Sequence, residues 1–365
     1  MGRLTLTNEP TEGIRHSSGQ AVTARRAPGR GALAAGGRET LTRSLIPHAG
    51  AFVITAALLS VIQSLSVPKP FLLAERFLPG AGWIEVLLVA SYAAWAVGKL
   101  LDPRAAPVWR RRLWTLFSLV FFTQLALGLA GFDIFLMTGK LHLPVPALIL
   151  AGPLYRAERF FMPLLFLSTV LIVGPAWCSY LCYIGAWDSA AASRKRSATP
   201  LPRWRNLFRG TVAALVIACA LLLRAIGAPP AAAAAVGAAF GLIGMAVMLV
   251  WSRRTGTMVH CVMWCPIGLA ATVAGKLNPF RLRIDPSCTN CGRCTLICRY
   301  DAMRPSDLAR GRPGGSCTLC GDCIGCCPRS SISYRFAGLS RETARRLFLV
   351  LVVSLHAVFL AVARI

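Results

Sequence analysis

The chain has 365 residues, of which 55% are hydrophobic, and its mean hydropathy is +0.58. This composition is too apolar for a water-soluble protein and favours a membrane protein. A formal net charge of +26 would suit binding to nucleic acid. The basic residues, however, stand in blocks between long apolar runs, so we expect no nucleic-acid partner and a membrane environment instead.

The first 44 residues are rich in Gly, Ala, Thr and Arg. This composition predicts a disordered basic tail over residues 1–44, close to an anionic cytoplasmic leaflet. The first apolar run begins near residue 48 and is long enough to remain in the membrane as an anchor, so we expect no cleavable signal peptide.

Apolar runs long enough to span a bilayer follow along the chain. Six are long, and the seventh lies at the lower limit for a span. They lie near residues 48–67, 82–101, 114–137, 160–177, 208–227, 231–251 and 347–363. Basic blocks occupy the tail and the connections after the second, fourth and sixth runs, which the positive-inside rule places in the cytoplasm. We predict a mainly α fold, a polytopic transmembrane helical bundle of six to seven spans in a bacterial inner (cytoplasmic) membrane.

Residues 143–155 are apolar, too short to span a membrane, and contain three prolines. Because proline breaks helices, we predict a re-entrant or interfacial segment here. Ionisable residues at membrane depth are functional candidates by default. His142, Asp133 and Glu158 are therefore candidates for a quinol site, and interface anchors or ion pairs are an equal alternative.

The fourth and sixth runs end in the same pattern, C-x3-C-x-I-G, with the pairs Cys178/Cys182 and Cys261/Cys265. Both runs cross in the same direction, so the pattern indicates a parallel duplication. On a helix, residues four apart share a face. The four thiols are candidates for an additional metal or iron–sulfur site, and the alternative is four buried small residues.

Two runs of the form C-x2-C-x2-C-x3-C follow, at Cys288, Cys291, Cys294, Cys298 and at Cys317, Cys320, Cys323, Cys327. This spacing is that of bacterial ferredoxins with two [4Fe–4S] clusters, in which the fourth cysteine of each run binds the other run's cluster. The spacing therefore assigns Cys288, Cys291, Cys294 and Cys327 to cluster 1, and Cys317, Cys320, Cys323 and Cys298 to cluster 2.

Zinc is a weaker alternative. It needs four ligands but usually takes them as two pairs, so it does not require a third cysteine at x2 and a fourth at x3 in each of two runs. A reducing cytosol disfavours disulfides. We predict an α+β module at 276–340, between a transmembrane domain at 45–275 and a last transmembrane helix at 341–365. The residue after Cys298 is Arg299 where the second run has Pro328, which predicts a looser first loop or a more exposed cluster.

The tandem cysteine runs, the two C-x3-C elements and the residues around Trp177 resemble the NapH/NosR-type membrane polyferredoxins. The resemblance covers about residues 48–335. It implies cytoplasmic clusters, quinol as electron source and periplasmic partner proteins as acceptors. Tyr183 departs from the pattern by replacing a proline that often follows the first pair.

The expected function is relay of electrons between the quinone pool and a partner redox protein. Whether the chain is an enzyme, as a quinol-oxidising subunit, or a carrier stays open at this point. The alternative is a copper (metal) reductase or oxidase-assembly factor that uses the membrane-proximal cysteine pairs. The basic residues of the ferredoxin module are expected to raise cluster potentials and attract an acidic partner. They are Arg293, Arg299, Arg304, Arg310, Arg312 and Arg329.

Overall fold

The computed structural model describes the backbone of residues 30–65, 67–136 and 143–362, with side chains from residue 45 onward. The chain divides into two units, Met1–Arg43 and Ser44–Ile365, and the second holds the membrane spans and all the candidate sites. Helix α1 (Arg30–Gln63) begins inside the segment predicted to be disordered. Residues 30–44 are thus helical in the described structure, and residues 1–29 lie outside it.

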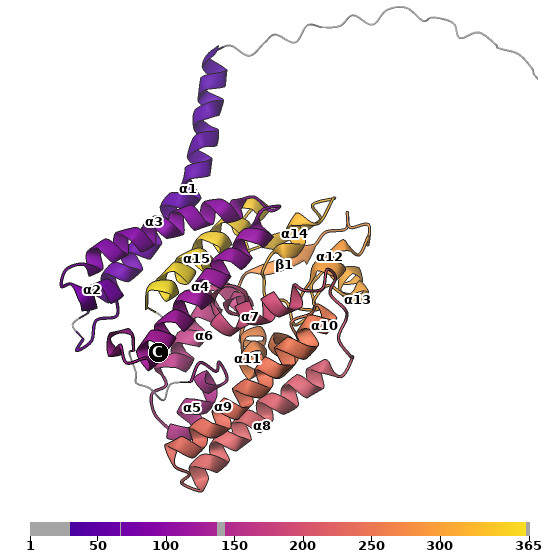
Figure 1. Cartoon of the computed structure of the whole chain (residues 1–365). Coiled ribbons are helices and arrows are strands. Elements are labelled where there is room, and N and C mark those ends of the chain that lie inside the picture. The colour runs from indigo at the N-terminus through magenta and orange to yellow at the C-terminus, as the bar shows by residue number, and fades with distance from the viewer. Residues whose placement is uncertain (1–29, 66, 137–142, 363–365) are drawn as a thin grey trace, which may run out of the picture. The chain divides into compact units, whose positions relative to one another are not determined.

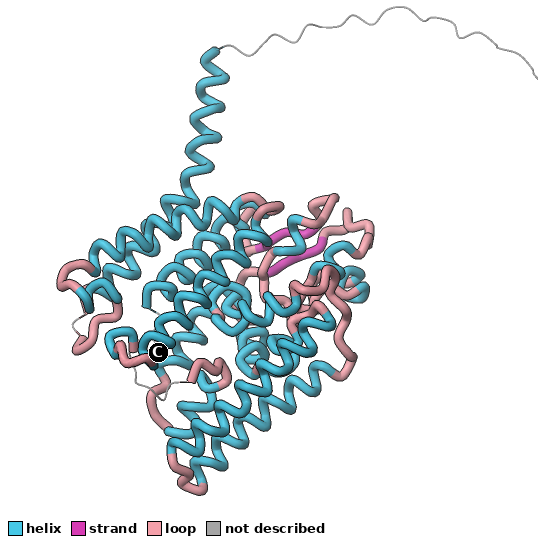
Figure 2. The backbone as a smooth tube through the Cα atoms, viewed as in Figure 1, coloured by secondary structure: helices cyan, strands magenta, loops and turns pink. Residues whose placement is uncertain are grey.

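The described residues contain seven helices long and apolar enough to cross a membrane, which confirms the predicted fold class (Figures 1 and 2). These spans are Leu45–Gln63, Gly82–Leu101, Ala106–Leu129, Phe161–Leu181, Arg205–Ala225, Pro230–Thr255 and Arg341–Val362. The corresponding long helices are α1, α3 (Gly82–Leu101), α4 (Ala106–Leu129), α6 (Phe161–Val173), α8 (Arg205–Ala225), α9 (Pro230–Val247) and α15 (Arg341–Val362).

Short elements join these helices. They are α2 (Leu73–Phe77), η1 (Asp133–Phe135), α5 (Leu148–Arg156), η2 (Gly174–Ala176), η3 (Trp177–Leu181), α7 (Tyr183–Ala192), η4 (Met248–Ser252), α10 (Arg253–Thr255), η5 (His260–Trp264) and α11 (Pro266–Ala274). Helix α5 corrects the prediction that prolines keep residues 143–155 from forming a helix. Pro144 and Pro146 precede it, and its nine residues tolerate one internal proline, Pro153.

The third span begins at Ala106 instead of near residue 114. The sequence assigned Arg110 to a polar connection, yet this side chain lies within α4 and is only 3% exposed. Its guanidinium donates to both carboxylate oxygens of Asp322, at 2.9 and 2.6 Å. A carboxylate partner lets a charged residue enter the buried part of a helix.

The last helix, α15, is the most deeply packed span, with 61% of its apolar window buried. Phe359 meets Trp177 edge-to-face with ring centroids 5.4 Å apart, and Phe348 stacks on Tyr334 at 4.6 Å. Because Tyr334 belongs to the cysteine-rich segment, α15 connects that segment to the helical bundle.

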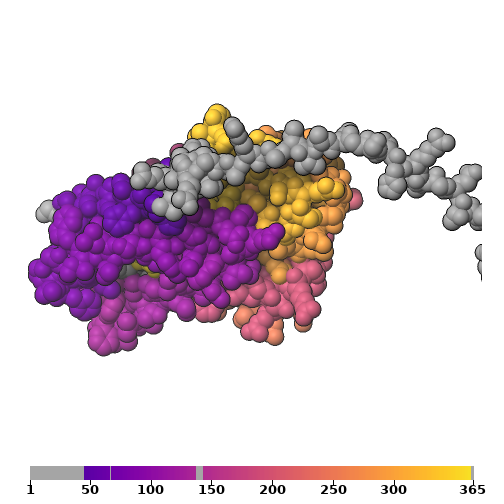
Figure 3. Space-filling model, turned by 90° about the horizontal axis from the view of Figure 1, so that it is seen from above, coloured from indigo at the N-terminus to yellow at the C-terminus, as the bar shows by residue number. Residues whose placement is uncertain are grey.

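The cysteine-rich segment forms a small module between α11 and α15. Strands β1 (Arg281–Ile284) and β2 (Ile332–Arg335) pair antiparallel, with Arg281 opposite Arg335 and Ile284 opposite Ile332. Between them lie the short helices α12 (Arg293–Ile297), α13 (Pro305–Ala309) and α14 (Asp322–Gly325). The orange and yellow residues of this part of the chain gather beside the purple helices in Figure 3. We call residues 276–340 the ferredoxin module.

Candidate metal centres

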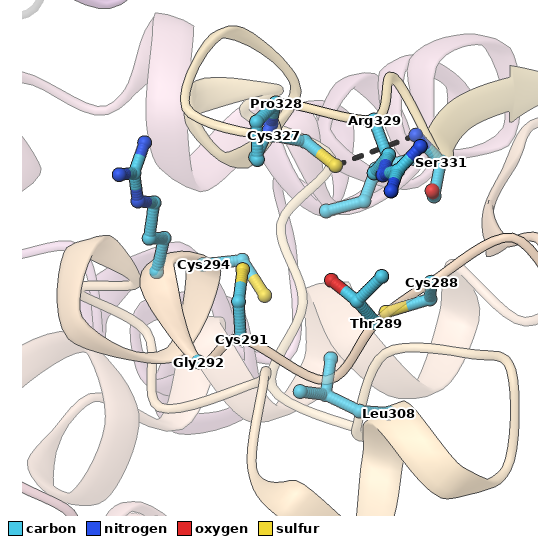
Figure 4. A pocket seen from close by; sticks show the side chains of 12 residues that line it. Cys288, Thr289, Cys291, Gly292, Cys294, Leu308, Cys327, Pro328, Arg329 and Ser331 are labelled. Atoms are coloured by element: carbon cyan, nitrogen blue, oxygen red, sulfur yellow. Dashed lines mark hydrogen bonds between the residues drawn. The ribbon is translucent and has the colours of Figure 1, made fainter. Parts of the chain in front are cut away.

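The first cysteine group lines one pocket of the ferredoxin module. Cys288, Cys291, Cys294 and Cys327 surround about 350 Å³ of empty space, counting its open mouth. Figure 4 shows their side chains around this common space. The pocket thus brings together three cysteines of the first run and the last cysteine of the second, the set that the spacing assigned to cluster 1.

Left-handed backbone turns shape both cysteine runs in the same way. Asn290 and Gly292, on either side of Cys291, have φ of 51° and 72°, and Leu319 and Gly321, on either side of Cys320, have φ of 54° and 77°. Two such residues turn the chain sharply, so successive cysteines face one space instead of alternating. The matching turns explain why two copies of one spacing form two similar sites.

The second group contains Cys298, Cys317, Cys320 and Cys323. Cys323 interacts electrostatically with the other three, so these thiols also lie near one another. Burial raises the pKa of Cys323 above its ordinary value and that of Cys317 to about 12. A buried thiolate needs positive charge nearby, which the irons of a cluster provide.

Backbone amides point at the cysteine sulfurs, as a bound anionic cluster requires. The N–H of Ala302 donates to Cys298 Sγ, and the N–H of Ser331 donates to Cys327 Sγ, each at 3.3 Å. Hydrogen bonds to sulfur stabilise the charged form and tune iron–sulfur sites. The residues of both groups therefore fit [4Fe–4S] clusters.

The ferredoxin module rests on the first C-x3-C element through direct hydrogen bonds. Tyr300 donates its hydroxyl to the carbonyl of Cys178 at 3.3 Å, and Tyr180 donates to that of Cys320 at 3.2 Å. Ser179 donates to the carbonyl of Thr318 at 3.1 Å. The second cysteine group is thus the one nearest the bundle, whereas Cys291 of the first group is exposed.

Arg299 also fixes the module. Its guanidinium donates to the carbonyls of Gly256, Lys195 and Arg196 at 2.6, 2.8 and 3.2 Å. The expectation of a looser loop after Cys298 is therefore wrong, because these contacts replace the rigidity that proline gives the second run.

The two C-x3-C pairs come together in a second pocket. Cys178, Cys182, Cys261 and Cys265 all line about 280 Å³ of empty space. We call this the four-cysteine pocket. The sequence suggested that each pair lies on an α-helix, but the structure shows that neither does. The first cysteines lie in the π-helical turns η3 and η5, and the second ones are extended residues that precede α7 and α11.

The repeat geometry extends to the backbone that follows the second cysteines. The N–H groups of Ile184 and Gly185 lower the pKa of Cys182, and those of Ile267 and Gly268 lower that of Cys265. Burial raises the pKa of Cys182 to about 12, against the effect of these amides. Each repeat therefore offers one sulfur at the start of a helix, where N–H groups favour negative charge.

The glycine of each C-x3-C-x-I-G pattern permits close packing on the first cysteine. A Cβ at Gly268 would lie 2.6 Å from the carbonyl oxygen of Cys261, and one at Gly185 would lie 3.0 Å from that of Cys178. Backbone atoms cannot move aside as a flexible side chain can. Glycine is thus required at both positions.

We expect Gly268→Ala to lower the free energy of unfolding by roughly 1–3 kcal/mol, the usual effect of overpacking. Chemical unfolding followed by tryptophan fluorescence measures the loss. Gly210→Ala is the matched control, because a Cβ there meets nothing within 4 Å. Equal stability of the two variants would contradict the close approach at Gly268.

Three polar side chains beside the four-cysteine pocket were not among the sequence candidates. Asp188 is fully buried, and its Oδ2 accepts the N–H of Cys261 at 3.0 Å. Burial raises the pKa of Asp188 to about 6. His260 lines the pocket, and neither ring nitrogen has a hydrogen-bond partner. Arg209 interacts electrostatically with Cys178, Cys265 and Cys261.

No group of three or more His, Cys, Asp or Glu among the described residues could hold a metal ion. This applies to the ferredoxin cysteines and to the four-cysteine pocket alike. In a cubane each thiolate binds a different iron, so its ligands surround a group of atoms instead of one ion. The cysteine sets therefore differ from single-ion sites.

Neither of the two described quinol-site candidates lines a cysteine pocket. Asp133 is in η1, Glu158 follows α5, and both are exposed, while His142 lies outside the described residues. The segment between them reaches inward, since Pro146 lines the four-cysteine pocket.

Comparison with known proteins supports an iron–sulfur protein of the ferredoxin type. A family model described as a 4Fe-4S binding domain matches residues 158–197 and 238–284. Each matched segment contains one C-x3-C pair, in agreement with the duplication. The chain is also similar to the putative electron transport protein YccM of Escherichia coli (strain K12), with 23% identity over 226 residues. That match covers 56% of this chain and 60% of YccM, less than two thirds of its length. No solved structure matches.

Proposed function

We propose that this chain is a multi-pass membrane protein that relays electrons between the quinone pool and a partner redox protein. Its relative YccM is named an electron transport protein, which supports this role. So do the family match and the seven apolar helices. The narrower resemblance to NapH/NosR-type polyferredoxins rests on the cysteine spacing. We assign the chain to the bacterial inner membrane, and the distribution of basic residues favours a cytoplasmic ferredoxin module.

The observation that carries the proposal is the placement of the two cysteine groups. The second group lies against the bundle, where Tyr300 donates to the carbonyl of Cys178 and Tyr180 donates to that of Cys320. The first group opens at the surface beside Arg293 and Arg329. A [4Fe–4S] cluster supplies one-electron transfer when bound. The residues that would hold the two clusters thus form a line from bundle to surface.

We propose Asp133, Glu158 and His142, the last of which is outside the described residues, as the proton acceptors of the quinol site. The support is the course of residues 143–156. Pro146 lines the four-cysteine pocket, and the chain then runs through α5 to Glu158. This segment would give the quinol ring an apolar contact surface, and the ionisable groups would receive its protons.

The test uses the full-length protein, purified without oxygen and placed in vesicles with a short-chain quinol. We expect quinol to bleach the visible absorbance of the oxidised clusters, and Glu158→Gln to slow the bleaching while the iron content is unchanged. Bleaching by a soluble reductant but never by quinol would reject the quinone pool as electron source. Protein free of iron would reject the function as a whole.

The acidic-partner hypothesis can be made more specific, because the module's arginines differ in their contacts. Arg304 and Arg310 pair with Asp301 and Asp307. Arg293 and Arg329 are exposed beside the first cysteine group, and neither forms an ion pair within the described part of the chain. They are therefore free to meet a partner.

We expect the double variant Arg293→Glu/Arg329→Glu to slow electron exchange with an acidic ferredoxin or flavodoxin by on the order of tenfold at low salt. Stopped-flow rates measured against ionic strength provide the test, and the wild-type rate should fall with added salt. Arg253→Glu, at an exposed residue of α10, controls for a general charge effect. A wild-type rate independent of salt would contradict electrostatic docking.

A further inference from the structure

Arg209 of α8 is a buried guanidinium without a counter-ion. It is 6% exposed, and its Nε has no hydrogen-bond partner. One turn earlier, Arg205 pairs with Asp301, and in α4 Arg110 pairs with Asp322. Within the described residues Arg209 has no such carboxylate. A buried charge left unpaired costs several kcal/mol, so this arginine calls for an anion.

The groups around Arg209 show where that anion belongs. The electrostatic partners of Arg209 are Cys178, Cys265 and Cys261. Its Nη2 lies 3.2 Å from the position that a Cβ of Gly268 would occupy, and Gly268 lines the four-cysteine pocket. Neutral thiols would leave the guanidinium uncompensated, whereas ligated thiolates would compensate it.

The pocket resembles the first cysteine group in its donors. Four sulfurs line each pocket, and the empty volumes are about 280 and 350 Å³. In both, backbone N–H groups favour the charged form of a cysteine sulfur: those of Ile184 and Gly185 lower the pKa of Cys182, and that of Ser331 donates to Cys327 Sγ. Neither set has the arrangement of a single-ion site. These shared features favour a polynuclear group over one copper or zinc ion.

We propose that Cys178, Cys182, Cys261 and Cys265 hold a third iron–sulfur cluster of the [4Fe–4S] type, and that Arg209 balances its negative charge. Each repeat supplies two ligands, so the site exists only where the two C-x3-C elements meet. Four thiolates outweigh the cubane's positive charge, which leaves the cluster a net anion. The purpose of this cluster rests on the proposed electron-carrier function, but the occupancy of the site can be measured independently.

The first experiment is iron, sulfide, copper and zinc analysis of the full-length protein purified without oxygen, with EPR of the reduced form. We expect about twelve irons per chain. Cys261→Ala/Cys265→Ala should retain about eight and keep the ferredoxin signals. Cys219→Ala, a cysteine of α8 outside the pocket, is the matched control and should retain all.

A second variant tests the site if the pocket variant does not fold. Cys291→Ala/Cys320→Ala removes one ligand from each ferredoxin cluster and should retain about four irons. Complete loss of iron from this folded variant would overturn the proposal. About eight irons in the wild type would also overturn it. So would stoichiometric copper or zinc that is present in the wild type and absent from Cys261→Ala/Cys265→Ala. Eight irons together with bleaching by quinol would leave the proposed function standing while rejecting the third cluster.

The role of Arg209 has its own readout. We expect Arg209→Gln to shift the midpoint potential of the third EPR signal downward, because one positive charge fewer makes addition of an electron less favourable. Alternatively, the third cluster is lost, so that the signal disappears and the protein holds about four irons fewer. Arg209→Lys should retain the signal nearer its original potential. An unchanged third signal in Arg209→Gln would contradict charge balance by this residue.

Discussion

Cys298→Ala and Cys320→Ala should abolish the same EPR signal, although these cysteines come from different runs. Cys291→Ala and Cys327→Ala should abolish the other ferredoxin signal. Each variant should lose about four irons per chain. The reason is that Cys298 lies with the second run's thiols, and Cys327 lines the pocket of the first run. Loss of one signal by both Cys298→Ala and Cys291→Ala would contradict this exchange of ligands.

Cys326 requires a control in that experiment, because it is adjacent to Cys327. Its thiol donates to the carbonyl of Cys323 at 3.2 Å, and it is not among the residues that line the pocket. Cys326→Ala should therefore keep both signals. If Cys327→Ala alone keeps its cluster, Cys326→Ala/Cys327→Ala shows whether the neighbouring sulfur has replaced the lost ligand.

Asp322→Asn should destabilise the protein by about 3–5 kcal/mol, because it leaves Arg110 charged and without its carboxylate in a buried site. Arg110 also donates to the carbonyl of Ser179 at 3.0 Å, so the pair joins α4, η3 and the ferredoxin module. Chemical unfolding followed by cluster absorbance measures the effect. The module should separate from the bundle before the spans unfold.

Two variants give this prediction its controls. Arg335→Gln removes one of the two arginine partners of Asp285, in a pair whose arginine is 40% exposed, and such pairs contribute about 0–1 kcal/mol. Arg110→Met/Asp322→Leu replaces both buried charges by apolar groups and should recover most of the stability. A loss below about 1 kcal/mol in Asp322→Asn would contradict a structural role for the buried pair.

Hydropathy predicted the seven spans because it depends on neighbouring residues alone. It misplaced the start of α4 because the partner of Arg110 lies 212 residues away in the chain. The cysteine spacing predicted which thiols the structure brings together, since a repeated pattern implies repeated geometry. It could not predict the π-helical turns at both C-x3-C pairs.

The polar residues around the four-cysteine pocket were beyond sequence reasoning for another reason. Arg209 belongs to a basic block that predicts a cytoplasmic connection. Asp188 and His260 are single residues outside any recognised motif. Their significance depends on which helices pack together. A signal was nevertheless present, because Asp188 follows the first pair closely and His260 directly precedes Cys261.

The position of α15 has a consequence for biosynthesis. This helix follows the ferredoxin module in the chain, yet it packs against β2, η3, α6 and α4. A ribosome therefore delivers every cysteine before the segment that holds module and bundle together. Chains that are still being synthesised would keep the module loosely attached. Scaffold proteins that deliver iron and sulfide would have their best access in that interval, before insertion of the last helix closes the assembly.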